Sequence, residues 1–284
     1  MSRNGSAYRV YFIINLESEC YYFMNYHLLT LFPNILDSYI SESIIGRAID
    51  SKIISVNKYN IRDYSTDKHK KVDGRAYGGG PGMVMWVDPI IRCLDKVKLD
   101  IEKRISKENI KQEKKYQKDI IKNPPSRFGK KPKEVKSKVL VVNFSPGGQE
   151  FTNDKAKKVS SAYTDIVFIC GRYEGVDSRV VDILKAEEWS IGNYVLTGGE
   201  LAAAVCIDSV SRQIPGVLGK EESLEENRIS SHKIYGRPEV YEHKTFVLDR
   251  KSKTLKSKIK KYKVPEVLLS GHHKNIEKWK KGEL

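Results

Sequence analysis

The sequence predicts an α/β fold with a largely parallel sheet, and two observations support this prediction. Strand-like apolar runs alternate with helix-like segments along the chain, which is the order of repeated strand–helix units. Glycine-bearing turns follow several of these runs, where open parallel sheets usually bind ligands. The 284 residues are enough for one large domain or two modest domains with a real core.

The N-terminal stretch lies outside this pattern. Residues 1–23 are rich in aromatics and carry Glu17 and Glu19, where a signal peptide would stay apolar. We therefore treat 1–23 as an N-terminal extension and expect the functional chain to start near Met24. A native protein whose N-terminus is Ser2 would contradict this expectation.

Three elements are predicted in the next part of the chain. His27–Phe32 is a strand that Pro33 ends. Asn34 can cap a helix that runs to about Ile49, because its apolar residues recur at roughly helical spacing. Ile53–Tyr59 alternates apolar and polar residues like a strand.

A glycine-rich loop follows. Residues Tyr77–Met83 contain three consecutive glycines before a Pro-Gly pair, so this loop has almost no side-chain bulk. Such a chain suits close packing against a flat ring or a backbone, whereas the alternative is a flexible tight turn. We favour a functional loop because Asp73 and Arg75 lie beside it.

A helix start and a lysine-rich segment come next. Asp88 is the predicted N-cap and Pro89 the first helical residue. The helix from Ile90 to about Lys98 merges into a lysine-rich segment, Lys103–Lys138, with few apolar anchors. We interpret this segment as a solvated insertion, partly helical and partly disordered. It is either a surface loop or a contact for RNA phosphates.

The second half of the chain continues the α/β order. Strands are predicted at Lys138–Phe144 and Ile166–Cys170, and helices at about Thr152–Ser160 and Glu200–Arg212. In the last helix, Asp208 and Arg212 lie one turn apart and can form an ion pair.

Two glycine-bearing turns lie in this half, Gly171–Gly175 after a strand and Ile191–Gly199 before the last helix. Glycines let a ligand approach bare backbone, and a helix N-terminus offers unpaired N–H groups. Together the turns can wall one small-molecule pocket, although each alone also fits an ordinary turn.

Composition narrows the class of protein. Lys and Arg (51) exceed Asp and Glu (36), and the net charge of +15 suggests a polyanionic partner; a lysine-rich composition is the alternative. The four cysteines have no metal-ligand spacing and no disulfide framework, which fits a reducing compartment and predicts a cytoplasmic protein. No apolar run approaches a membrane span, so we expect no membrane partner.

The C-terminal part is predicted to hold a flexible hinge, 219–238, and a small basic domain, 239–284. The run Arg250–Lys263 is strongly basic, and a closing helix spans His272–Lys280. The basic run is either a phosphate-binding surface or a solvated charge run.

Several long motifs occur in the order of one known enzyme class. They are Leu31-Phe32-Pro33, Val72-Asp73, Tyr77–Met83, Ser145-Pro146, Cys170–Asp177, Glu188–Glu200, Ile207–Arg212, Ile214–Gly219, Arg237–Val240 and Val264–Gly271. From about Met24 to the C-terminus the chain resembles the TrmD-type bacterial tRNA (guanine-N1)-methyltransferases of the SPOUT class, with Lys103–Lys138 as an extra insertion.

The resemblance implies a SPOUT domain over 24–218 with a deep trefoil knot around the two turns, and a shortened, helical C-terminal domain. It implies a homodimer that binds tRNA and methylates N1 of guanine 37, beside the anticodon, with S-adenosylmethionine; Mg²⁺ is implied by the family alone, and no metal ligands are predicted. The implied cofactor-binding residues are Pro146, Gly171, Tyr173, Glu174, Ile191, Gly192, Asn193, Tyr194, Val195, Leu196, Gly198 and Gly199. The implied guanine-binding residues are Asp73, Tyr77, Gly78, Gly79, Gly80 and Pro81.

The catalytic positions depart from the family. The family's general base is an aspartate, and gapless alignment from Gly219 places Asn227 there, whose amide cannot take the N1 proton. The adjacent Glu226 can replace it if the hinge shifts by one residue, and Arg212 can stabilise the negative charge that grows on O6. The alternatives are a protein that binds tRNA and cofactor with weak or absent catalysis, and a lysine-rich RNA chaperone without a pocket.

Overall fold

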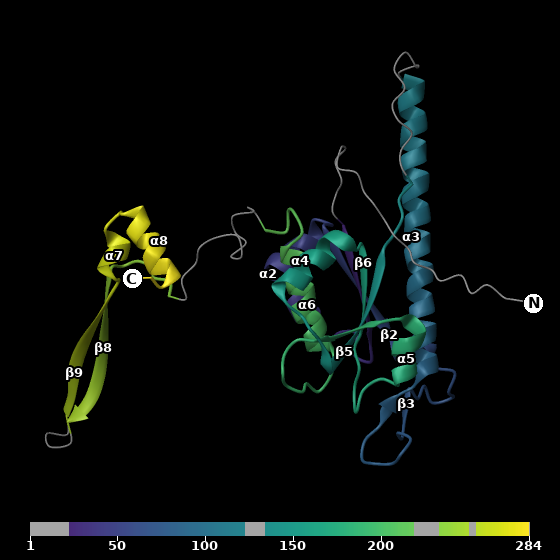
Figure 1. Cartoon of the computed structure of the whole chain (residues 1–284), viewed down its shortest axis with the longest axis horizontal. Coiled ribbons are helices and arrows are strands. Elements are labelled where there is room, and N and C mark those ends of the chain that lie inside the picture. Colours follow the sequence, from purple (N-terminus) through teal and green to yellow (C-terminus); the bar gives the residue numbers. More distant parts are fainter. Residues whose placement is uncertain (1–22, 123–133, 219–232, 250–253, 284) are drawn as a thin grey trace, which may run out of the picture. The chain divides into compact units, whose positions relative to one another are not determined.

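A computed structural model describes residues 23–122, 134–218, 233–249 and 254–283, and Figure 1 shows the course of the chain. The chain divides into two compact units, Met1–Gly219 and Lys220–Leu284. The first unit holds the parallel sheet and the second a two-stranded hairpin with two short helices.

The sheet has five parallel strands in the order β2-β1-β6-β5-β7. The strands are β1 (Met24–Thr30), β2 (Ile54–Asn60), β5 (Val139–Glu150), β6 (Asp165–Ile169) and β7 (Glu187–Ser190). β1 and β6 are buried along their whole length; β6 is apolar after Asp165, whereas β1 also buries the polar residues Asn25, His27 and Thr30. The predicted α/β fold with a parallel sheet is therefore confirmed.

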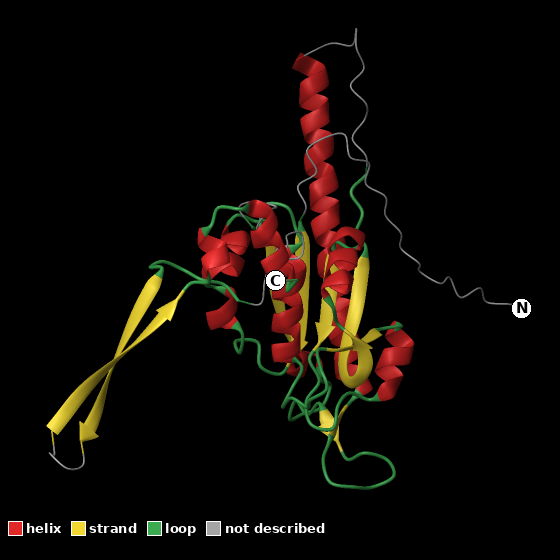
Figure 2. Cartoon of the chain, turned by 60° about the vertical axis from the view of Figure 1, so that its left-hand side comes forward, coloured by secondary structure: helices red, strands yellow, loops and turns green. Residues whose placement is uncertain are grey.

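Helices cover both faces of the sheet (Figure 2). One core contains residues of α1 (Asp37–Ile40), α2 (Ser43–Asp50), α4 (Asn153–Ala162) and α6 (Glu200–Arg212). The other contains residues of α3 (Val87–Lys122), α5 (Ser178–Leu184) and the 3₁₀ helix η1 (Ile61–Tyr64). Trp189 and Phe168 fill the first core and contact each other edge to face.

The predicted single helix from Asn34 to Ile49 is wrong, because the chain forms the two short helices α1 and α2 there. Glu42 is extended and Ser43 has a φ of 56°, and this pair of conformations interrupts the helical turn. Gly46 allows the sharp break, since a Cβ atom there would lie 2.4 Å from the carbonyl oxygen of Ser41. The spacing of apolar residues did not reveal this break.

The predicted bounds of two further elements, α3 and β5, are also wrong. α3 begins at Val87, so Asp88 lies inside the first turn, where its carboxylate accepts hydrogen bonds from Arg92 Nε at 2.9 and 2.8 Å. α3 then continues through the lysine-rich segment to Lys122. β5 extends beyond Phe144 to Glu150 and contains an irregular stretch with a register shift.

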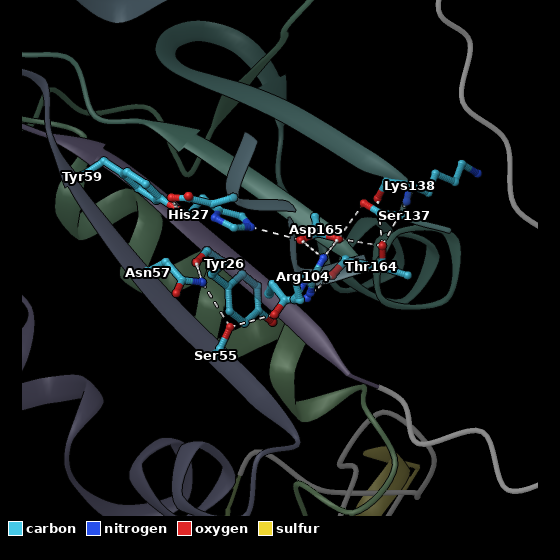
Figure 3. Close-up of polar contacts among 12 residues, drawn as sticks. Tyr26, His27, Ser55, Asn57, Tyr59, Arg104, Ser137, Lys138, Thr164 and Asp165 are labelled. Atoms are coloured by element: carbon cyan, nitrogen blue, oxygen red, sulfur yellow. Dashed lines mark hydrogen bonds and ion pairs between the residues drawn. The ribbon is translucent and has the colours of Figure 1, made fainter. Parts of the chain in front are cut away.

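A buried carboxylate joins α3 to the sheet at the amino ends of the strands (Figure 3). Asp165 has no exposed surface, and its Oδ1 lies 3.0 Å from His27 Nε2. Arg104 Nη2 donates to its two oxygens at 2.7 and 2.8 Å, and the hydroxyls of Ser137 and Thr164 donate at 2.9 and 2.8 Å. Burial acts to raise the pKa of Asp165, but the hydrogen bond from His27 and the charge of Arg104 outweigh it and lower the pKa.

We expect Asp165→Asn to lower the free energy of unfolding by about 3 kcal/mol, because it removes one partner of a buried charged cluster. Because the folded pKa of Asp165 lies below the unfolded value of about 3.9, its stabilisation is present at neutral pH and is lost as the pH falls below about 4. Urea unfolding at pH 7 and at about pH 2 to 3 measures both effects. The control Asp95→Asn removes an exposed contact with Lys98 and should change stability by less than about 0.5 kcal/mol. Equal effects of the two substitutions would contradict the role of Asp165.

The second unit differs from the predicted helical domain. Residues Val240–Asp249 (β8) and Thr254–Lys263 (β9) form an antiparallel hairpin in which Val240 pairs with Lys263. Aromatic and β-branched residues recur in this segment and favour strands. The helices are α7 (Glu266–Leu269) and α8 (His273–Lys281), the latter close to the predicted closing helix.

Candidate active site

Two turns that are far apart in the sequence are in contact at the carboxyl ends of the strands. The first, 170–175, follows β6, and the second, 191–199, connects β7 to α6. The N–H of Gly199 donates to the carbonyl of Gly171 at 3.0 Å, and Arg172 pairs with Gly198 as an antiparallel bridge. The two turns therefore form one connected surface.

Glycine is required where the turns meet. A Cβ atom on Gly199 would lie 2.9 Å from the Cα of Cys170, and one on Gly198 would lie 2.4 Å from Nε of Arg172. The separation at Gly199 is shorter than a Cβ atom tolerates next to backbone, and a Cβ atom on Gly198 would force the side chain of Arg172 to move. Both glycines thus have a packing role in addition to the predicted contact with a cofactor.

A buried ion pair stabilises the contact between the turns, and it was not among the predicted site residues. Arg172 Nη2 lies 2.9 Å from Oε2 of Glu200, Arg172 Nε donates a 3.3 Å hydrogen bond to Oε1, and Glu200 is 2% exposed. Oε1 of Glu200 accepts a 2.6 Å hydrogen bond from Thr30 Oγ1 at the end of β1. The Arg172 guanidinium also lies 4.5 Å from the ring centre of Phe32. Opposite charges in the first turn and at the start of α6 were the sequence signal for this pair.

The second turn presents open backbone and exposed side chains. Gly192 has a φ of 151°, and Ser190 Oγ donates to its carbonyl at 3.0 Å. Exposed side chains are those of Asn193, Tyr194 and Val195, whereas Ile191 and Leu196 are half-buried. Within the described part of the chain, the N–H groups of Asn193, Val195 and Leu196 donate to no acceptor. Free donors beside apolar side chains suit a flat ring with acceptor atoms on its edge.

Pro146 lies in the irregular stretch of β5 beside the second turn. Phe144 and Gln149 both align with Trp189 of β7, so the register shifts over the residues between them. A Cβ atom on Gly148 would lie 2.7 Å from the carbonyl of Glu188. The stretch that contains Pro146 is therefore pressed against the end of β7, where the second turn begins.

The glycine-rich loop contacts the first turn. β3 (Asp73–Gly74) and β4 (Val84–Met85) form a short antiparallel pair, and residues 75–83 are its tip. The N–H of Glu174 donates to the carbonyl of Met83 at 3.0 Å. A Cβ atom on Gly82 would lie 2.5 Å from Oε1 of Glu174. The predicted guanine loop is thus in direct contact with a predicted cofactor turn.

The end of this loop is open. Tyr77 is 99% exposed, and Cβ atoms on Gly78, Gly79 and Gly80 would meet nothing within 4 Å. These glycines have φ values of 88°, 78° and 109°, so backbone conformation rather than packing explains them. Pro81 is exposed and Asp73 is half-buried at the base of the loop. The loop has room for a flat base to pack against its backbone.

Arg212 lies far from the turns of its own chain. It ends α6, twelve residues after Glu200, which is about 18 Å along the helix axis. Its neighbour Ser211 hydrogen-bonds through Oγ to the hydroxyl of Tyr26 at 2.8 Å, near the start of β1. This end of α6 therefore lies toward the amino ends of the strands. The structure does not bring Arg212 together with the cofactor turns within one chain.

The predicted catalytic residues Glu226 and Asn227 and the predicted partner of Arg212 remain to be placed. Glu226 and Asn227 lie outside the described residues. The predicted ion pair between Asp208 and Arg212 is not formed, because Oδ2 of Asp208 accepts a 2.5 Å hydrogen bond from the hydroxyl of Tyr39. Among the described residues, no carboxylate forms an ion pair with Arg212.

The buried thiols and the available metal donors limit the chemistry of this site. Burial raises the pKa of Cys170 and of Cys206 well above the ordinary range, so both remain protonated and are not nucleophiles. In the described ranges, no three His, Cys, Asp or Glu side chains gather closely enough to hold a metal ion. The described helices also contain no segment that is long and apolar enough to span a membrane.

Comparison with known proteins gives consistent matches over almost the whole chain. A family model described as tRNA (Guanine-1)-methyltransferase TrmD matches residues 24–127 and 119–284. A tRNA (guanine-N(1)-)-methyltransferase of Clostridioides difficile is 41% identical over 264 residues, which covers 92% of each chain. Relatives with the same name from Ruminiclostridium cellulolyticum and Mycoplasma capricolum are 42% and 36% identical, each over 90% of this chain and over 89% and 85% of their own lengths.

Proposed function

The chain belongs to the tRNA (guanine-1)-methyltransferase family, and from this premise we propose that it transfers a methyl group from S-adenosylmethionine to N1 of guanine 37 in tRNA. The observation that carries the proposal is the contact of the glycine-rich loop with the first turn at Gly82 and Glu174. The glycine-rich loop, which has room for a flat base, therefore adjoins the surface of the two turns, which suits a nucleoside cofactor.

The residues present fit S-adenosylmethionine, which supplies an electrophilic methyl group on a sulfonium when it is bound. The free N–H groups of the second turn can bind the edge of the adenine, and Tyr194 and Val195 can cover its face. A base in the anticodon loop can be splayed out without extraction from a duplex. The turns would hold the methyl group and the glycine-rich loop would hold N1 of the guanine in line with it. Such groups react more readily, because their orientation is already fixed.

The reaction also needs a base and a charge partner. A bond forms between the methyl carbon and N1 while the bond between that carbon and sulfur breaks, and the N1 proton must leave. Glu226 takes this proton, and the guanidinium of Arg212 stabilises negative charge on O6. Mg²⁺ stays an expectation from the family resemblance, and no step in this scheme uses it.

The position of Arg212 supports a homodimer. Arg212 shares one face of α6 with Leu201, Val205 and Asp208, which lie at helical spacing. Leu201 and Val205 are exposed, and Tyr39, bound to Asp208, extends this apolar face across α1. A second copy that covers this face would bury its apolar area and bring its own Arg212 toward the turns of the first copy.

We expect Leu201→Asp to convert the dimer to a monomer, because it places a charge in the centre of the proposed interface. Sedimentation analysis of the full chain measures this change. Ile183→Asp is the control, since Ile183 and Leu201 are both 58% exposed but Ile183 lies on α5, on the other face of the sheet. A monomeric unmodified chain would contradict the proposal.

Three further features belong to this proposal. The deep trefoil knot around the turns stays a prediction, which the parallel sheet and the family support. The cysteines of the described residues are free thiols, which supports the cytoplasm as the site of action. The hinge 219–238 and the insertion boundaries also stay predictions.

Asn227 motivates a second candidate function, a protein that binds tRNA and cofactor with little catalysis. An amide at the general-base position accepts no proton at neutral pH. The two candidates share the cofactor turns and differ only in turnover.

A methylation assay separates them. Purified protein, unmodified tRNA with guanine at position 37 and S-adenosylmethionine should yield 1-methylguanosine, detected by mass spectrometry of the digested RNA. The control tRNA carries adenine at this position and should remain unmodified. Stoichiometric cofactor binding by calorimetry without any product would support the second candidate.

A further inference from the structure

We propose that the part of α3 beyond the sheet binds the phosphate backbone of tRNA at a distance from the methylated base. The surface concerned, here called the lysine face, consists of Lys103, Lys107, Lys111, Lys114, Lys115 and Lys118. This inference rests on the proposed tRNA substrate and adds a second contact region. Figure 1 shows α3 continuing well past the strands of the sheet.

The spacing of the lysines places them on one side of the helix. At about 100° per residue, all six side chains fall within an arc of about 120°. All six are exposed. Segment 103–118 contains two acidic residues, Glu108 and Glu113, and their helical positions lie outside this arc. No carboxylate of the described residues forms an ion pair with any of the six lysines. The lysine face is therefore a concentrated positive charge without ion pairs to the described residues, although Lys103, at its end nearest the sheet, interacts electrostatically with Asp100.

Two contacts anchor the helix where it leaves the sheet. Arg104 is bound to the buried Asp165. One turn further, the side chain of Asn109 donates to the carbonyl of Val135 at 3.1 Å and accepts from its N–H at 2.7 Å. The lysines thus extend from an anchored helix, so less conformational entropy is lost when they bind than for lysines on a flexible tail.

The residue types favour RNA over a lipid surface or a protein. A helix that lies on a membrane needs an apolar face beside its basic face. Of the apolar residues in 103–118, Ile110 is exposed, whereas Ile105 and Tyr116 are half-buried. Protein interfaces also need apolar or aromatic anchors, which this surface lacks. Lysine side chains act as point charges that suit phosphates without reading sequence.

The lysine face is well separated from the methylation site. Val87, the first residue of α3, follows the hairpin that carries the glycine-rich loop. Lys103 lies about 24 Å and Lys118 about 46 Å from Val87 along the helix axis. Contacts at this distance act on the affinity for tRNA and not on the chemical step.

The test is a variant of the full chain with Lys103, Lys107, Lys111, Lys114 and Lys118 each replaced by Gln. We expect its affinity for full-length tRNA at about 0.1 M salt to fall at least about tenfold. The slope of log Kd against log salt should decrease in magnitude by about 2 to 4, since each lost phosphate contact removes about 0.7 to 0.9. The rate at saturating tRNA and the free energy of unfolding should stay unchanged. A short anticodon stem-loop RNA should lose much less affinity, because it cannot reach from the site to Lys118.

A rearranged variant serves as a control for net charge. It combines Lys107→Gln and Lys111→Gln with Ser106→Lys and Gln112→Lys, so two lysines leave the face while the net charge stays the same. We expect its salt slope to decrease by about 1 to 2. A slope equal to that of the unmodified chain would show that bulk charge suffices and would overturn the proposal.

The remaining outcomes are also decisive. An unchanged tRNA affinity in the five-residue variant refutes the lysine face as an RNA contact. Loss of binding to phosphatidylserine vesicles in that variant, with tRNA binding unchanged, assigns the face to membranes instead. Because tRNA binding is measured without turnover, a chain that binds through the lysine face but forms no 1-methylguanosine refutes only the methylation.

Discussion

Glu226→Gln is expected to lower the rate of 1-methylguanosine formation by about 10²- to 10⁴-fold at saturating tRNA and cofactor, because the N1 proton loses its acceptor. Glutamine keeps the size and the hydrogen-bonding capacity of the side chain but cannot be protonated at neutral pH. Binding of the cofactor and of tRNA should therefore change little. Single-turnover methylation together with calorimetry measures the rate and the two affinities.

Neighbouring substitutions control for this assignment. Glu225→Gln removes the same charge one residue earlier and should change the rate by less than about threefold, since the proposal assigns the N1 proton to the carboxylate of Glu226. An unchanged rate in Glu226→Gln means that Glu226 is not the base. A large gain of activity in Asn227→Asp would show that position 227 is the working position and that the natural chain is a weak catalyst.

Arg212→Ala is expected to lower the rate by about 10²- to 10³-fold, as loss of one fixed group that stabilises transition-state charge usually does. Arg212→Lys should recover only part of this loss, because an ammonium cannot reproduce the planar fork of a guanidinium. The expected effect is on the rate at saturation, since Arg212 lies about 18 Å from the start of α6 and does not contribute to the cofactor turns of its own chain.

Mixed dimers test whether Arg212 of one copy acts at the cofactor turns of the other copy. Gly192→Val should abolish cofactor binding, because a side chain there meets the ring of Tyr194 and the φ of 151° disfavours it. Alone, Arg212→Ala and Gly192→Val are both nearly inactive. Co-purified as a mixed dimer, they should regain activity, since one site then combines intact turns from one copy with Arg212 from the other. No recovery in verified mixed dimers would contradict a site shared between two copies.

Much of the fold and of the family assignment was predictable from local sequence. The buried strand β6 follows the apolar run Ile166–Cys170 that was predicted as a strand, and the helix Glu200–Arg212 was predicted with its observed bounds. Local pattern failed at Glu42 and Ser43, where a backbone break leaves the apolar spacing intact. The helical C-terminal domain was implied by the resemblance, whereas the β-branched and aromatic residues of 240–263 agree with the hairpin that forms there.

The sequence by itself determined the candidate residues, because the glycine-bearing turns and the glycine-rich loop are visible along the chain and the family resemblance singles out Asn227. Only the tertiary structure decided which of them meet. It joined Gly171 to Gly199 and Gly82 to Glu174, revealed the Arg172–Glu200 ion pair, and placed Arg212 at the far end of its helix. The physical reason is that such contacts depend on strand order and close packing between segments distant in sequence, which no local pattern records.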